Sequence, residues 1–100
     1  MNMLINTVMQ EKVRIEHMLS QYRKILEELP KGSISERTVK DKTYFYLKYR
    51  DGKRVKSKYI SREKVDDIRM GLEKRKHTQT MIDSLQKEYA LAQKILEGNI

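Results

Sequence analysis

The stretch TYFYLKYRDGKRVKSKYI, residues 43–60, decides the fold. Its first seven residues are rich in aromatic side chains, and its last six alternate apolar or aromatic with polar residues. Both patterns predict β-strands, and the Asp51-Gly52 step between them is typical of a β-hairpin. Residues 33–39 predict a third strand, with a turn near Asp41. We therefore expect a three-stranded antiparallel meander.

The length of the hairpin turn decides which side chains share a face of this sheet. A two-residue turn would pair odd positions with even ones and place Phe45 and Leu47 beside lysines. A three-residue loop over residues 50–52, with Gly52 in a left-handed bulge, would pair odd positions with odd ones. Only the second arrangement separates apolar from basic side chains, and we predict it for that reason.

The predicted register gives the sheet an apolar face and a basic face. The apolar face would carry Phe45, Leu47, Tyr49, Val55 and Tyr59. The basic face would carry Tyr44, Tyr46, Lys48, Arg54, Lys56 and Lys58. The residues directly opposite one another would be Lys48 and Arg54, Tyr46 and Lys56, and Tyr44 and Lys58. Like charges in direct opposition cost stability, and an acidic ligand would offset that cost.

A helical pattern precedes the meander. Apolar residues recur at heptad spacing over residues 3–29, where Val8, Ile15 and Tyr22 lie seven apart. Pro30 ends the pattern, because the residue before a proline is disfavoured in the α conformation.

A second helical pattern follows the meander over residues 61–97. Ser61 is its predicted N-cap, Gly98 its predicted stop, and Gly71 predicts a weak point near residues 71–80. The predicted fold class is α+β, with two long antiparallel helices joined by a small three-stranded antiparallel β-meander in a single domain of 100 residues. Because such a chain buries only a thin core, we expect a homodimer formed through the helices.

The net charge of the chain lies in residues 31–64. This segment holds twelve Lys and Arg against four Asp and Glu, a net of +8, whereas the rest of the chain holds ten of each sign. Basic residues interleaved with tyrosines favour a polyanion, most often nucleic acid. Lysines that protect a sheet edge from aggregation are the alternative, but that role needs fewer charges. The predicted nucleic-acid-binding residues are Tyr44, Tyr46, Lys48, Arg50, Arg54, Lys56 and Lys58.

Two modes of binding fit this set of residues. A two-stranded ribbon can enter the major groove of DNA, and an aromatic sheet face can stack on unpaired bases. In both modes the cations contact phosphates, and the tyrosines pack on bases or sugars. The residues leave open DNA or RNA, and single or double strand.

Several function classes are disfavoured by composition. The chain has no cysteine, so it has no disulfide or thiolate metal site, and no apolar run approaches the roughly 20 residues that span a bilayer. We expect a cytoplasmic location and no membrane partner. His17 and His77 lack ligand-type neighbours, and no catalytic set stands out. We therefore expect neither an enzyme nor a metal or other cofactor.

Four short motifs carry a resemblance: LPKGSI at residues 29–34, VKDKTYFYL at 39–47, YRDG at 49–52 and KSKYI at 56–60. They resemble a family of short, uncharacterised bacterial and mobile-element proteins, over roughly residues 29–65. That resemblance implies a helix, a strand meander and a second helix, and no established activity. The meander is also similar to the arm-binding domain of phage-type tyrosine recombinases, which implies DNA binding through a sheet.

Three functional hypotheses follow. The first is a small, non-catalytic nucleic-acid-binding protein that uses the basic, tyrosine-bearing face of its meander. The alternative is a mobile-element inhibitor or adaptor, of the anti-CRISPR kind, that binds a protein or a nucleoprotein complex. A purely structural coiled-coil element ranks last, because it leaves the concentration of charge unexplained.

Overall fold

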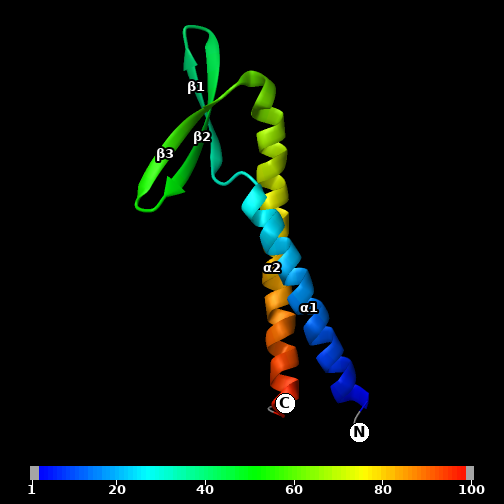
Figure 1. Cartoon of the computed structure of the whole chain (residues 1–100). Helices are drawn as coiled ribbons and strands as arrows, with labels where there is room; N and C mark the ends of the chain where they lie inside the picture. Colours follow the sequence, from blue (N-terminus) through cyan, green and yellow to red (C-terminus); the bar gives the residue numbers. More distant parts are fainter. Residues whose placement is uncertain (1–2, 99–100) are drawn as a thin grey trace. The chain divides into compact units, whose positions relative to one another are not determined.

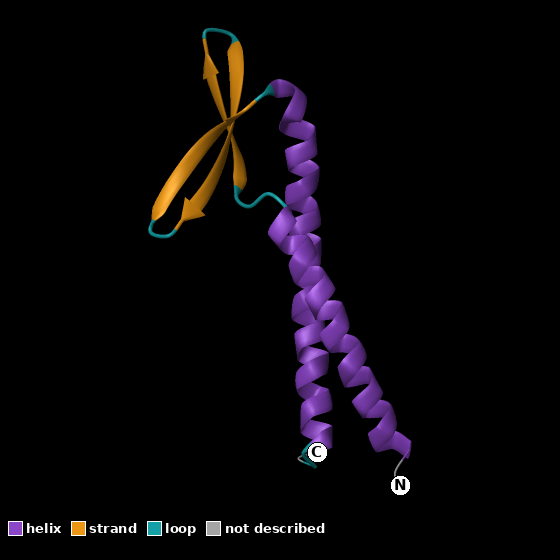
Figure 2. Cartoon of the chain, viewed as in Figure 1, coloured by secondary structure: helices purple, strands orange, loops and turns teal. Residues whose placement is uncertain are grey.

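The computed structural model describes residues 3–98. Its elements are α1 (Met3–Glu28), β1 (Ser33–Val39), β2 (Lys42–Asp51), β3 (Arg54–Ile60), a 3₁₀ turn (Arg62–Lys64) and α2 (Val65–Leu96) (Figures 1 and 2). The predicted α+β class is confirmed: along the chain, one long helix precedes and another follows a three-stranded antiparallel sheet.

The chain divides into two compact units. We call α1 with residues 77–96 of α2 the helical unit, and residues 29–76 the sheet unit. The single-domain assignment stays a prediction. Within residues 3–98, no helix is long and apolar enough to cross a membrane.

The helical unit is held together by apolar contacts between two antiparallel helices. Its core consists of four buried residues, Ile15, Leu19, Ile82 and Leu85. At one side of this core the Tyr89 hydroxyl donates a hydrogen bond to Oε1 of Glu16 at 3.1 Å. The Lys12 ammonium lies 5.4 Å from the centroid of the Tyr89 ring, a cation–π contact. The predicted apolar stripes therefore meet, and the expected homodimer stays a prediction.

The two ends of α2 differ in how well they were predicted. Ser61 stands at the N-cap position of the 3₁₀ turn, but its side chain makes no capping hydrogen bond. Its carbonyl instead accepts a hydrogen bond from the Lys64 amide at 2.9 Å, so the predicted side-chain cap is wrong. Gly98 has a φ of +73°, and its amide donates to the Ile95 carbonyl at 3.1 Å. The predicted glycine stop is therefore confirmed.

Gly71 permits a close contact inside the sheet unit. A Cβ atom at this position would lie 2.6 Å from Cγ of Pro30, closer than two carbon atoms can approach. One turn later, Nη1 of Arg75 donates a hydrogen bond to the Leu29 carbonyl at 3.3 Å. The linker after α1 therefore packs on α2, which is an unbroken helix across the predicted weak point.

The sheet has the order β1-β2-β3, and both of its turns contain two residues. Lys40 and Asp41 have φ values of 47° and 66°, as in a type I′ turn. Gly52 has a φ of 62°, and Lys53 follows it without a positive φ, as in a type II′ turn. The predicted three-residue loop is therefore wrong, because the turn begins at Gly52 instead of ending there.

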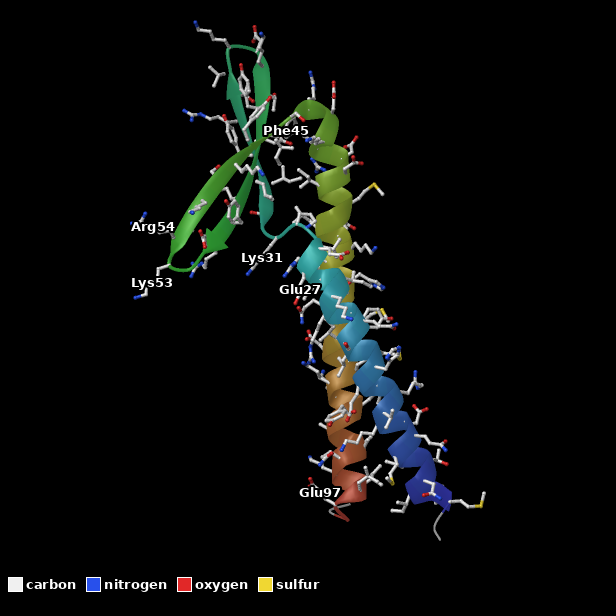
Figure 3. The ribbon with its side chains drawn as sticks, viewed as in Figure 1. Glu27, Lys31, Phe45, Lys53, Arg54 and Glu97 are labelled. Atoms are coloured by element: carbon white, nitrogen blue, oxygen red, sulfur yellow. The ribbon has the colours of Figure 1, made fainter. Side chains whose placement is uncertain are left out.

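The buried part of the sheet is confined to its middle. Phe45 pairs with Ile60, and Ile34 pairs with Leu47, so these four side chains share one face. Ile60 is only 3% exposed, and the other three are half-buried. Figure 3 labels Phe45 beside the middle of the sheet. Away from this middle the side chains of the strands are mostly polar or charged and exposed.

Candidate nucleic-acid interface

The observed register divides the predicted site between the two faces of the sheet. Paired residues share a face, and successive residues alternate between faces. One face, which we call the tyrosine face, carries Tyr44, Tyr46, Lys48 and Arg50 of β2. The opposite face carries Arg54, Lys56 and Lys58 of β3. The predicted basic face combined the residues of both sets except Arg50, which was predicted in the loop. That prediction is wrong, because the two-residue turn pairs odd positions with even ones.

The predicted cross-strand pairs are wrong for the same reason. Lys48 lies opposite Ser57 and not opposite Arg54, and Tyr46 lies opposite Tyr59 and not opposite Lys56. Tyr44 lies opposite Arg37 of β1 and not opposite Lys58. The like-charge opposition expected at Lys48 is therefore absent, and the tyrosine face gains a third tyrosine.

Val55 and Tyr59 of β3 lie on the tyrosine face, although the sequence interpretation placed both on the apolar face. Tyr59 is the one of the two that adds an aromatic ring to the candidate site. Its ring centroid lies 5.9 Å from that of Tyr46, and the two ring planes meet at 70°. This edge-to-face arrangement stabilises a sheet directly. Tyr59 is 58% exposed, whereas Tyr44 and Tyr46 are half-buried. A two-residue turn that starts at Gly52 pairs Asp51 with Arg54, and the same register pairs Tyr46 with Tyr59. Placing the turn in this way would have assigned Tyr59 to the tyrosine face.

A shallow hollow lies at the centre of the sheet unit. Its volume is ≈ 300 Å³, and its lining residues are Ser35, Glu36, Arg37, Tyr46, Lys48 and Ser57. Two cations and three hydroxyl groups suit an anion with several acceptor oxygens, such as a phosphate group. Glu36 also lines the hollow, and its negative charge opposes that use.

Few of the cations of residues 31–64 are neutralised by neighbours. Among the described residues, only Lys56 of this segment forms an ion pair, from Nζ to Oδ2 of Asp51 at 2.7 Å. Both side chains of that pair are more than half exposed, so the pair contributes at most about 1 kcal/mol. The arrangement suits contacts with an external polyanion. Residues 3–98 contain no group of three or more His, Asp or Glu side chains placed to hold a metal ion.

Comparison with known proteins gives a family and no activity. No curated protein and no solved structure matches the chain. The family match covers residues 8–70, which include most of α1, the whole sheet and the start of α2. It therefore extends beyond the motifs of the meander, and it agrees with the expected uncharacterised family. The chain belongs to the family described as a domain of unknown function, DUF6788.

Proposed function

We propose that this protein binds nucleic acid through the cations of its sheet and does no chemistry on it. One observation carries the proposal: the net charge of +8 lies in residues 31–64, where a single cation has an acidic partner among the described residues. Unpaired cations in mutual repulsion favour an anionic partner, and nucleic acid offers the densest row of anions.

Binding in this proposal is mainly electrostatic. Lys48 and Arg50 on one face, and Arg54 and Lys58 on the other, contact phosphates. Base stacking has a smaller role than the sequence suggests, because Tyr46 packs its ring against Tyr59. On duplex DNA, the logarithm of the binding constant would fall by about 0.9 per phosphate contact for each tenfold rise in salt.

A charge-reversal experiment tests the proposal. The variant Lys48→Glu/Arg54→Glu/Lys58→Glu removes exposed cations from both faces of the sheet. A matched control, Lys24→Glu/Lys87→Glu/Lys94→Glu, makes the same change of charge at exposed positions of the helical unit. Mobility shift with duplex DNA, single-stranded DNA and structured RNA, at two salt concentrations, measures binding. Circular dichroism checks that both variants keep their helical content.

We expect the sheet variant to lose binding and the helix control to keep most of it. Equal binding by the sheet variant and the parent would overturn the proposal. A pull-down from a bacterial lysate, with and without nuclease, addresses the alternative of a mobile-element inhibitor or adaptor. A protein partner that survives nuclease, and that the sheet variant fails to capture, would replace nucleic acid as the target.

A further inference from the structure

The two hairpins of the sheet extend past each other at opposite ends. β1 pairs with β2 only as far as Ser33 and Lys48, whereas β3 pairs with β2 as far as Arg54 and Asp51. Residues 49–56 are therefore a two-stranded ribbon without a third strand, as Figure 1 shows at the β2–β3 turn. We call residues 49–56 the β2–β3 ribbon.

The β2–β3 ribbon carries cations on both faces and at its turn. Arg50 lies on the tyrosine face, and Arg54 and Lys56 lie on the opposite face. Lys53 occupies the turn, and in Figure 3 the side chains of Lys53 and Arg54 point away from the strands. All four cations are exposed, and the only acid of the ribbon, Asp51, pairs with Lys56.

A ribbon charged on both faces fits a partner that surrounds it. A ligand that lies flat on the sheet would contact the cations of one face and leave those of the other in water. A groove with an anionic wall on each side would contact both sets together. The major groove of B-form DNA has phosphates along both walls, and it admits a two-stranded β-ribbon.

The dimensions of the ribbon agree with that groove. Stacked sheets lie about 10 Å apart, so a single sheet with its packed side chains occupies about that thickness, and the major groove is about 12 Å wide. Three residues of each strand extend beyond β1, which gives about 10 Å of free length against a groove depth of about 8.5 Å. The minor groove, about 6 Å wide, is too narrow. The major groove of A-form RNA is deep and narrow, and an unpaired strand has no groove at all.

We propose that the β2–β3 ribbon enters the major groove of duplex DNA, with Arg50 facing the phosphates of one strand and Arg54 those of the other. This inference rests on the proposed function and assigns its target. Lys53 at the turn is then the cation nearest the base edges.

The first experiment compares ligands and uses the full chain. Fluorescence anisotropy measures binding to a 20-base-pair DNA duplex, the same duplex with glucosylated 5-hydroxymethylcytosine, a single strand of the same sequence, and an RNA duplex. The glucosyl groups fill the major groove and leave the phosphates and the minor groove unchanged. We expect the plain DNA duplex to bind at least tenfold more tightly than each of the other three.

The outcomes separate this inference from the proposed function. Equal affinity for plain and glucosylated duplex, or tighter binding to RNA or to the single strand, overturns the major-groove inference and leaves nucleic-acid binding in place. Absence of binding to all four ligands overturns both. This comparison needs no variant, so it does not depend on how well a substituted protein folds.

The second experiment compares the two hairpins. The variant Arg50→Gln/Arg54→Gln removes one cation from each face of the β2–β3 ribbon, and Lys40→Gln/Lys42→Gln removes the same charge from the β1–β2 hairpin. The salt dependence is the slope of the logarithm of the binding constant against the logarithm of the salt concentration. We expect the ribbon variant to reduce the magnitude of this slope by about 1.8, because two phosphate contacts are lost. The control should change it little. Equal changes in both variants would show general charge attraction and overturn the inference.

Discussion

The helical unit and the sheet unit differ in what they contain: most buried apolar residues lie in the helical unit, and the positive charge lies in the sheet unit. The helical unit contains the core cluster around Ile15 and Ile82, and residues 1–28 and 77–100 hold six Lys and Arg against seven Asp and Glu. The sheet unit, residues 29–76, holds sixteen against seven and has few buried apolar residues, among them Ile60 and Val65. Apolar burial and positive charge therefore lie in different parts of the chain, so substitutions should affect stability and binding separately.

The largest expected effect is in the helical core. Ile82 is 3% exposed and belongs to the core cluster, so Ile82→Ala should lower the free energy of unfolding by about 3 kcal/mol, through lost burial and an unfilled cavity. Leu91→Ala, in the same helix at a side chain that is 53% exposed, should cost less than about 0.5 kcal/mol. Urea denaturation measures both. Similar losses in the two variants would contradict a core concentrated at the cluster.

A smaller effect is expected where β1 begins. Gly32 has a φ of +120°, and a Cβ atom there would overlap the backbone carbonyl oxygen of Lys48. Gly32→Ala should therefore lower the free energy of unfolding by about 2 kcal/mol, from backbone strain and a displaced strand. Gly52→Ala is the matched control, because Gly52 also has a positive φ, of 62°, but nothing lies within 4 Å of its added Cβ.

The control isolates backbone strain from the collision with Lys48. Gly52→Ala should cost about 1 kcal/mol, which is the strain of an alanine at a positive φ without a collision. Urea denaturation of both variants would separate the two terms. If Gly32→Ala cost no more than Gly52→Ala, the close approach of Gly32 to β2 would contribute nothing to the sheet unit.

Features that depend on neighbouring residues could be predicted from the sequence, and contacts between distant residues could not. Helix stripes and strands depend on local periodicity, so α1, α2 and the three strands were predicted within a few residues of their observed ends. The role of Gly71 depends on Pro30, which is far away in the sequence, and local propensity indicated a weak point instead. Such a contact is visible only when the fold is known.

The hairpin register was wrong for a reason that also bears on the candidate site. The prediction assumed that one whole face of the sheet is buried, which requires apolar and basic side chains to separate. In the structure only the middle of the sheet, near Phe45 and Ile60, is substantially buried. Lys56 and Lys58 therefore share a face with Leu47 and Tyr49 at little cost, because both lysine side chains stay exposed.

The smallest expected effect tests this register, and with it the division of the candidate site between two faces. Tyr46 and Tyr59 touch edge to face, so a double-mutant cycle of Tyr46→Leu and Tyr59→Leu should give a coupling free energy of about 1 kcal/mol. Tyr46 and Lys56 lie on opposite faces, so the cycle of Tyr46→Leu and Lys56→Gln should give a coupling near zero. The register predicted from the sequence reverses these results, because it places Tyr46 opposite Lys56 and Tyr59 behind the sheet. Coupling between Tyr46 and Lys56, with none between the tyrosines, would show that all the cations of β3 lie on the tyrosine face. A ribbon charged on one face only would then have no reason to enter a groove.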